Sequence, residues 1–301
     1  MKSIVVSWAF ALGISCAGPA LADLNILATV PEWGALAQEL GGDKVKVYTA
    51  TTALQDPHRI EARPSLIARA RGADLVVATG AELEVGWLPM VLQQGANAKV
   101  RPGTPGYFEA AAHVPLLGKP TRLDRAEGDI HPQGDPHLQL DPRNIARVAG
   151  PLAARMAELD PANAAHYQAR AKDFDARWSA ALARWDRAAT PLRGVPVVVQ
   201  HRSFTYLIAW LGMEEVAALE PKPGMEPTSA HLAEVLARLQ QRPAKVILRA
   251  AYQGDRATQW LAERAKIMPV ALPFTVGGTP EAKDLFGLFD DTIRRLLKGA
   301  A

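Results

Sequence analysis

Three of the seven histidines stand in contexts that suit a ligand-binding imidazole. His58 and His137 each end the tripeptide Asp-Pro-His, so the same short sequence occurs twice. Because proline fixes the turn before each imidazole, the side chain loses little entropy when it binds a ligand. His201 directly follows the apolar run 195–200, at the carboxyl end of an expected strand, where open α/β sheets bind their ligands. These contexts predict that the three rings share one binding site.

The other four histidines are weaker candidates. His166 lies outside the apolar stripe of an expected helix, His113 follows three alanines with no polar neighbour, and His231 is expected in the first turn of a helix. We interpret these three as surface or structural residues. His131, six residues before His137, has three open roles: a donor to the ligands, a weak extra ligand, or a gate over the site.

The chemistry of the site is restricted by the single cysteine, Cys16, which lies inside an expected export signal. Residues 1–22 combine an early lysine, an apolar stretch and a small-x-small pattern that ends at Ala22. We expect cleavage after Ala22 and a periplasmic mature chain. A lipid anchor on Cys16 is disfavoured because Gly13 stands where a lipobox would have leucine. The mature chain then contains no cysteine, so any metal must be held by nitrogen and oxygen.

The composition is that of a globular protein. Of 301 residues, 49% are hydrophobic and 22% are charged, which excludes a disordered or fibrous chain. The 34 lysines and arginines nearly balance the 31 acidic residues and form no block, so nucleic acid is not an expected partner. At about 150 residues per domain, the length predicts two domains, each able to bury a core.

Short apolar runs alternate with amphipathic stretches along both halves of the chain, which is the pattern of an α/β fold. Because the runs lack polar alternation, we expect mostly parallel sheets covered by helices on both faces. The expected strands are 24–28, 45–48, 75–79, 195–200, 245–248 and 270–272. The expected helical stretches are 33–40, 66–70, 206–211, 231–239 and 258–265. Residues 23–160 and 190–301 are therefore predicted to form two α/β lobes.

A long helix is predicted between the lobes, over residues 161–189. Large apolar residues recur there at spacings of three and four, as on one stripe of a helix. The stripe consists of Tyr167, Ala171, Phe174, Trp178, Leu182 and Trp185. At 1.5 Å per residue the helix would span roughly 42 Å, so we interpret it as a rigid connector along both lobes. A surface helix of one domain is the alternative.

Four motifs occur in a recognisable order along the chain. They are Asp56-Pro57-His58 and residues 131–142, 197–204 and 220–228. Over essentially its whole mature length the chain resembles the cluster A-I solute-binding proteins of ABC metal importers, the zinc and manganese receptors. The resemblance implies two lobes joined by a long helix, a metal ion in the cleft between them, and delivery to an inner-membrane ABC permease.

The resemblance also assigns metal ligands. His58 and His137 match the two ligands of the N-terminal lobe, and His201 matches the first ligand of the C-terminal lobe. The manganese receptors typically have a carboxylate at this third position. Three nitrogen ligands favour Zn²⁺ over the harder Mn²⁺.

The fourth ligand is left open by the resemblance. The family often has an aspartate shortly before the last helix, but the corresponding residues 272–278 contain no carboxylate. Water, Glu281 and Asp284 are the alternatives. The long His-rich acidic loop of some zinc receptors is also missing, since the segment between Gly118 and His131 is short and mixed.

The predicted function is capture of Zn²⁺, and of other divalent transition metals as a secondary cargo, by a monomeric receptor that catalyses no reaction. Because ligands come from both lobes, the ion should stabilise the closed form, and a stiff connector should limit the motion to cleft loops.

Two rival functions remain open. A periplasmic three-histidine zinc hydrolase or lyase would need a general acid or base beside a zinc-bound water. Glu61 and Asp141 are the nearest candidates, although a helix start or an outer-shell role explains Glu61 and a helix cap explains Asp141. A receptor for a haem or cobalamin-like ligand would share the architecture without needing three converging histidines.

Overall fold

The computed structural model describes residues 23–120 and 131–301. The predicted export signal, its cleavage after Ala22 and the lipid anchor on Cys16 lie outside the described residues, as do residues 121–130. Two four-stranded sheets are described, and all their strand pairs are parallel. The predicted class of two α/β lobes with mostly parallel sheets is confirmed. Within residues 23–120 and 131–301, no helix is long and apolar enough to cross a membrane.

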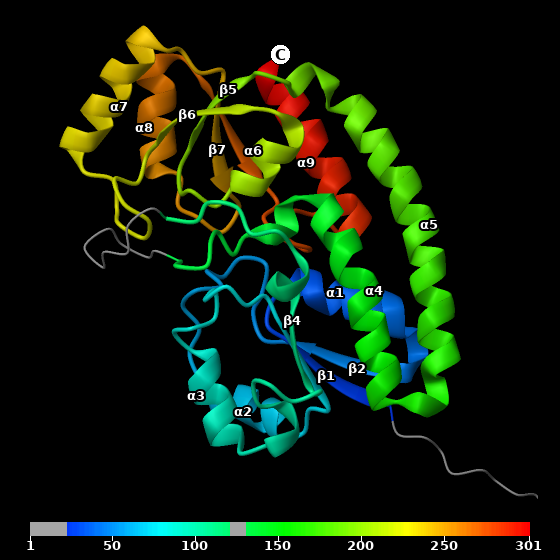
Figure 1. Ribbon diagram of the computed structural model, residues 1–301. Helices are drawn as coiled ribbons and strands as arrows, with labels where there is room; N and C mark the ends of the chain where they lie inside the picture. The colour runs from blue at the N-terminus through cyan, green and yellow to red at the C-terminus, as the bar shows by residue number, and fades with distance from the viewer. Residues whose placement is uncertain (1–22, 121–130) are drawn as a thin grey trace, which may run out of the picture.

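The N-terminal lobe is built on the first sheet, with strand order β2-β1-β3-β4. Its strands are β1 (Leu24–Ala28), β2 (Val45–Thr49), β3 (Leu75–Ala78) and β4 (Tyr107–Glu109). Its helices are α1 (Pro31–Gly41), α2 (Pro64–Arg71), α3 (Leu88–Gly95) and α4 (Pro142–Leu159). Helices α2 and α3 pack on one face of the sheet, where Leu66 and Val91 are buried with Leu27 and Val76 (Figure 1). Helices α1 and α4 belong to the core of the other face.

The C-terminal lobe repeats this arrangement, with strand order β6-β5-β7-β8. Its strands are β5 (Pro196–Val199), β6 (Glu214–Ala218), β7 (Val246–Ala250) and β8 (Met268–Leu272). Its helices are α6 (Thr205–Leu211), α7 (Ser229–Gln241), α8 (Arg256–Ala265) and α9 (Leu285–Ala300). Leu232 of α7 and Leu261 of α8 are buried with Val198 and Ile247 on one face, while α6 and α9 contribute to the core of the other.

The six predicted strands are present with boundaries shifted by no more than two residues. All four residues of β3 are buried, as expected of a strand covered on both faces. Strands β4 and β6 are additional to the prediction. Strand β4 has only three residues, and β6 begins with Glu214 and Glu215, so neither has the apolar run that indicates a buried strand.

The predicted connector is helix α5 (Ala164–Ala188), which follows a 3-10 turn at Pro161–Asn163. Figure 1 shows it running beside both lobes. Near its start, His166 and Arg170 bind the carbonyl oxygens of Gly41 and Glu39 at the end of α1. Further along, the buried rings of Trp178 and Trp185 pack against the aromatic residues of α9. The helix therefore contacts both lobes.

The two lobes share one buried apolar cluster. It extends from Leu36 of α1 and Val77 of β3, through Trp178 of α5, to Val199 and Leu248 of the second sheet. Opening the lobes widely would expose part of this cluster to water, at a free-energy cost of about 25 cal/mol for each Å² of apolar surface exposed. The core therefore favours small movements over a wide hinge.

Candidate metal centre

The three predicted ligands meet at one place between the lobes. The ring centres of His58 and His137 are 5.1 Å apart, those of His137 and His201 are 5.8 Å apart, and those of His58 and His201 are 6.2 Å apart. For two imidazoles on one tetrahedral zinc, with Zn–N bonds of about 2.0–2.1 Å, the ring centres are roughly 5 Å apart. Residues that are far apart in sequence thus form one cluster of imidazoles.

Each ring is carried by a loop at the carboxyl end of the sheets. His58 lies between β2 and α2, His137 lies directly before the 3-10 turn Leu138–Leu140 that leads into α4, and His201 lies two residues beyond β5. Because all strands in each sheet are parallel, their carboxyl ends share one edge, where loop side chains can converge.

The two Asp-Pro-His segments have the same local geometry. In the first, Asp56 Oδ1 accepts from the backbone N–H of His58 at 3.0 Å and pairs with His58 Nδ1 at 2.8 Å. In the second, the corresponding distances between Asp135 and His137 are 2.8 Å and 2.7 Å. Burial alone would raise the pKa of Asp56, but its hydrogen bonds with His58 lower that pKa to about 2. Each tripeptide therefore supplies both an imidazole and the carboxylate that orients it.

His201 is oriented by a distant carboxylate. Its Nδ1 lies 2.7 Å from Glu220 Oε2, and the same oxygen accepts from the backbone N–H of Gly224 at 2.8 Å. Glu220 follows strand β6, so the contact exists only when β5 and β6 are paired in the sheet. Glu220 was not predicted as a partner of His201, because the two residues are nineteen positions apart and no local pattern links them.

The ring nitrogens opposite these carboxylates are the atoms available to a metal. Within the described residues, Nε2 of His58 and Nε2 of His137 are buried without a hydrogen-bond partner. A buried polar atom left without a partner costs about 1–3 kcal/mol. A carboxylate on Nδ1 and a metal on Nε2 is the usual arrangement of a metal-binding histidine, and it would satisfy both nitrogens.

The cluster is wider than a loaded site would be. In residues 23–120 and 131–301, no group of three or more His, Cys, Asp or Glu side chains is already arranged to hold a metal ion. The widest of the three pairs, His58 and His201, joins the two lobes and exceeds the tetrahedral spacing by about 1 Å. Binding of one ion by all three rings therefore requires His58 and His201 to move closer together.

The proton affinities of His137 and His201 differ. Burial lowers the pKa of His137, although the hydrogen bond and charge of Asp135 act in the opposite direction. Burial also acts to lower the pKa of His201, but there the hydrogen bond and charge of Glu220 outweigh it, and the pKa is raised. His137 is therefore the ring more easily kept neutral, which is the form that binds a metal.

A cavity of about 270 Å³ adjoins the cluster. Its lining includes His58 and Asp56 from the N-terminal lobe and His201, Glu220 and Tyr252 from the C-terminal lobe. An ion in this cavity would reach imidazoles and carboxylates from both lobes.

A fourth imidazole lies beside the three predicted ligands. The ring centre of His131 is 5.4 Å from that of His58 and 6.3 Å from that of His137. The other histidines are elsewhere, and His113 is exposed and stacked on Phe108. His231 lies in the first turn of α7, as predicted. His166, which we expected at the surface, is half-buried because its ring binds the backbone of α1.

The carboxylates considered as a fourth ligand are engaged with helix α9. Glu281 pairs with Arg295 at 3.2 Å, and Asp284 accepts from the backbone N–H of Gly287 at 2.8 Å as the cap of the helix. In the stretch where the family often has an aspartate, Thr275 instead donates to Glu32 of α1. Burial raises the pKa of Glu32 to about 7.

The two candidate catalytic carboxylates are not placed for acid–base chemistry. Asp141 caps α4 through the backbone N–H of Arg143 at 2.9 Å and pairs with the guanidinium of the same arginine at 2.6 Å. Glu61 is exposed in the loop before α2. The structural interpretation of Asp141 as a helix cap is confirmed.

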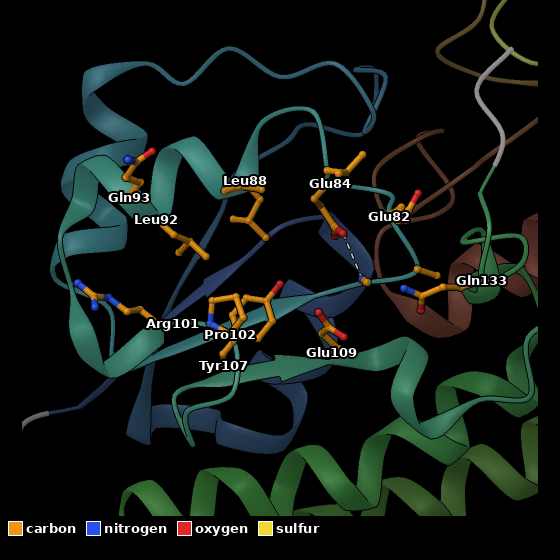
Figure 2. A pocket seen from close by; sticks show the side chains of 14 residues that line it. Glu82, Glu84, Leu88, Leu92, Gln93, Arg101, Pro102, Tyr107, Glu109 and Gln133 are labelled. Atoms are coloured by element: carbon orange, nitrogen blue, oxygen red, sulfur yellow. Dashed lines mark hydrogen bonds between the residues drawn. The ribbon is translucent and has the colours of Figure 1, made fainter. Parts of the chain in front are cut away.

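A second cavity, of about 620 Å³, lies in the N-terminal lobe (Figure 2). Leu88, Leu92 and Tyr107 contribute much of its wall. Its buried Glu84 accepts hydrogen bonds from Thr29 and from the backbone N–H groups of Thr79 and Gly80. This carboxylate is thus used in holding the loop after β3, and of the four clustered imidazoles none lines the cavity.

Comparison with known proteins gives a consistent result. Residues 26–299 match the family model of the periplasmic zinc-uptake complex component A, ZnuA. The zinc-binding lipoprotein AdcA of Streptococcus pneumoniae is 24% identical over 255 residues, covering 83% of this chain and 49% of that protein. The chain thus spans about half the length of the first such relatives. ZnuA of Paracoccus denitrificans is 26% identical, covering 95% of this chain and 93% of that protein.

Solved structures show the same fold. A crystal structure of ZnuA superposes with a TM-score of 0.76 at 20% identity, covering 93% of this chain and 100% of that one. The Ni²⁺ complex of FpvC from P. aeruginosa superposes with a TM-score of 0.73 at 23% identity, covering 93% of this chain and 98% of that one.

Proposed function

Because the chain belongs to the periplasmic zinc-uptake complex component A family, we propose that it is a receptor that captures Zn²⁺ for an ABC importer. The proposed ligands are His58, His137 and His201. The observation that carries the proposal is the pair of buried, unpartnered Nε2 atoms of His58 and His137, each opposite a carboxylate-bound Nδ1.

The donor set supports zinc over manganese. Imidazole nitrogen suits Zn²⁺ and the later transition metals, whereas Mn²⁺ is better matched by carboxylate and water oxygen. The carboxylates closest to the rings are already bonded to Nδ1 atoms, so they orient the ligands and are not the first choice as ligands themselves. Mn²⁺ is expected to bind more weakly.

Capture and release follow from the position of the site between the lobes. His58 and His137 belong to the N-terminal lobe and His201 to the C-terminal lobe, with the predicted boundaries at 23–160, 161–189 and 190–301. An ion that binds all three stabilises the closed form by its differential affinity for that form. The shared core and helix α5 favour a closure of loops over a wide hinge motion.

The family consists of solute-binding proteins of transport systems, and it supports export of this chain and work with a membrane permease. We propose that the chain is cleaved after Ala22, carries no lipid on Cys16, acts as a monomer and delivers the ion to an inner-membrane ABC permease. We also propose that it catalyses no reaction. Asp141 is used as a helix cap and Glu61 is exposed, which disfavours a zinc hydrolase or lyase.

Calorimetric titration of the metal-free mature protein tests the proposal. We expect one Zn²⁺ per chain, much weaker binding of Mn²⁺, and no hydrolysis of ester or amide substrates by the zinc-loaded protein. Absence of Zn²⁺ binding, or turnover of such substrates that depends on zinc, would overturn it.

A further inference from the structure

We propose that His131 is the fourth ligand, so that the captured ion is held by four imidazoles. This inference rests on the proposed function and extends it from three ligands to a complete set. The ring centres of His131 and His58 are 5.4 Å apart, and those of His131 and His137 are 6.3 Å apart. The three pairs of predicted ligands span 5.1–6.2 Å, so the distance from His131 to His58 falls within this range and the distance from His131 to His137 is slightly above it.

The loop around His131 holds its ring near the site. The carbonyl oxygen of His131 accepts from the backbone N–H of Gly134 at 3.0 Å, which closes a turn directly before the second Asp-Pro-His segment. Gly134 has a φ of +126°, and a Cβ there would lie 2.6 Å from the carbonyl oxygen of Leu117. The turn therefore requires glycine at position 134.

The same loop is tied to the C-terminal lobe. The hydroxyl of Tyr206 donates to the carbonyl oxygen of Asp135 at 2.9 Å and accepts from the backbone N–H of Leu117 at 3.1 Å. Asp135 also donates its backbone N–H to Leu117 at 2.8 Å. The segment that carries His131 and His137 is thus held from both sides.

Five carboxylates considered for the fourth position have other partners, and Glu226, which also lines the cavity, is exposed. Glu281 and Asp284 are bound to Arg295 and to the first turn of α9. Asp56, Asp135 and Glu220 are each bonded to an Nδ1 of the cluster. Of the four histidines outside the predicted ligand set, His131 is the one whose ring lies beside the predicted ligands.

A site of four imidazoles has distinct chemistry. The N-terminal lobe then supplies three of the nitrogens, so an ion can load on that lobe before His201 closes over it. A fourth protein ligand leaves no coordinated water, which separates a closed site from a catalytic one. The nitrogen donors also discriminate against Mn²⁺ more strongly than a site with one oxygen ligand would.

X-ray absorption at the zinc edge tests the inference directly. The zinc-loaded wild type is expected to fit four imidazole nitrogens, and His131→Ala to fit three nitrogens and one oxygen. By calorimetry, His131→Ala is expected to weaken Zn²⁺ binding by at least about 10–100-fold, because the loss of a group that only orients a ligand already weakens metal binding by that factor. The matched control is His113→Ala, which removes an exposed imidazole of the same lobe and should leave both readouts unchanged.

The possible outcomes are distinguishable. Three imidazoles and an oxygen in the wild type would overturn the inference, and so would an unchanged ligand count in His131→Ala, even with weaker binding. If His58→Ala abolishes binding while His131→Ala has no effect, only the fourth ligand is wrong. If both variants bind Zn²⁺ as the wild type does, the proposed function itself fails. Circular dichroism of each metal-free variant establishes that it is folded.

Discussion

The two lobes have the same sheet topology but orient their imidazoles by different means. In both sheets the first strand lies between the second and the third, and the fourth lies at an edge. In the N-terminal lobe, Asp56 and Asp135 orient histidines two residues further along the chain. In the C-terminal lobe, Glu220 orients His201 from nineteen residues away. The first arrangement is encoded in a tripeptide, whereas the second depends on strand pairing.

This difference extends to proton binding. The buried His137 has a lowered pKa, whereas His201 has a raised pKa because Glu220 outweighs the effect of burial. The C-terminal lobe therefore offers the imidazole that competes more strongly for a proton. His137 therefore stays neutral to lower pH than His201, so mild acid acts first on the imidazole of the C-terminal lobe.

The largest expected effect is the loss of a ligand from either lobe. His58→Ala, His137→Ala and His201→Ala should each weaken Zn²⁺ binding by more than roughly 100-fold, since even an outer-shell partner is worth about 10–100-fold. Calorimetry measures the effect. His166→Ala and His231→Ala serve as controls, because their rings bind backbone carbonyl oxygens outside the cluster. Equal losses in the two sets would contradict the ligand assignment.

The next largest effect is expected from the carboxylates that orient the histidines, and it compares the local Asp135–His137 pair with the distant Glu220–His201 pair. Asp135→Asn and Glu220→Gln should each weaken Zn²⁺ binding by about 10–100-fold, because the ligating ring loses a charged acceptor. Asp135→Ala should also lower the melting temperature, since Asp135 accepts from the backbone N–H of His137. If Glu220→Gln binds zinc as the wild type does, the orientation of His201 does not depend on Glu220.

Acid should weaken binding in two stages. The raised pKa of His201 means that a proton competes with Zn²⁺ at pH values above the ordinary histidine value of about 6.5. His137, with its lowered pKa, is protonated only at lower pH, where the affinity should fall more steeply. Titrations from pH 8 downward follow both stages, at up to tenfold per pH unit for each proton displaced. An affinity that is constant from pH 8 to pH 6.5 would show that His201 does not titrate first.

The metal-free protein should show the corresponding change in stability. A group whose pKa is higher in the folded state than in the unfolded state stabilises the fold at pH values below its unfolded-state pKa. This contribution is lost as the pH rises through its folded-state pKa. His201 therefore stabilises the metal-free fold at mildly acidic pH and ceases to do so at alkaline pH. His201→Ala should remove this part of the pH dependence of the melting temperature.

The smallest expected effect concerns the contact between the lobes at Tyr206. Tyr206→Phe removes the hydroxyl that joins Leu117 to Asp135 and should cost about 1 kcal/mol. For a chain of this size, the melting temperature should fall by about 2 °C. Zinc affinity should fall less than for any carboxylate variant, because the Asp135–His137 pair remains. A larger loss of affinity than in Asp135→Asn would show that the contact between lobes matters more than the local pair.

Much of the fold could be predicted because most of its strands and its long helix have recognisable hydrophobic patterns within a short stretch of sequence. The apolar runs predicted six strands, and the stripe of aromatic residues predicted α5, since both follow from the period of a buried strand or helix. Strands β4 and β6 escaped prediction because β4 is very short and β6 starts with two glutamates. The half-buried position of His166 also escaped, because it depends on contact with α1.

The sequence by itself determined which imidazoles are candidates and, through Asp-Pro-His, how two of them are held. Only the tertiary structure decided that Glu220 orients His201, that Glu281 pairs with Arg295 of α9, and that His131 lies beside the cluster. The physical reason is how far apart the contacting residues are along the chain. A turn of three residues closes its own hydrogen bonds, whereas contacts between loops of different strands form only after two sheets and a connecting helix have packed together.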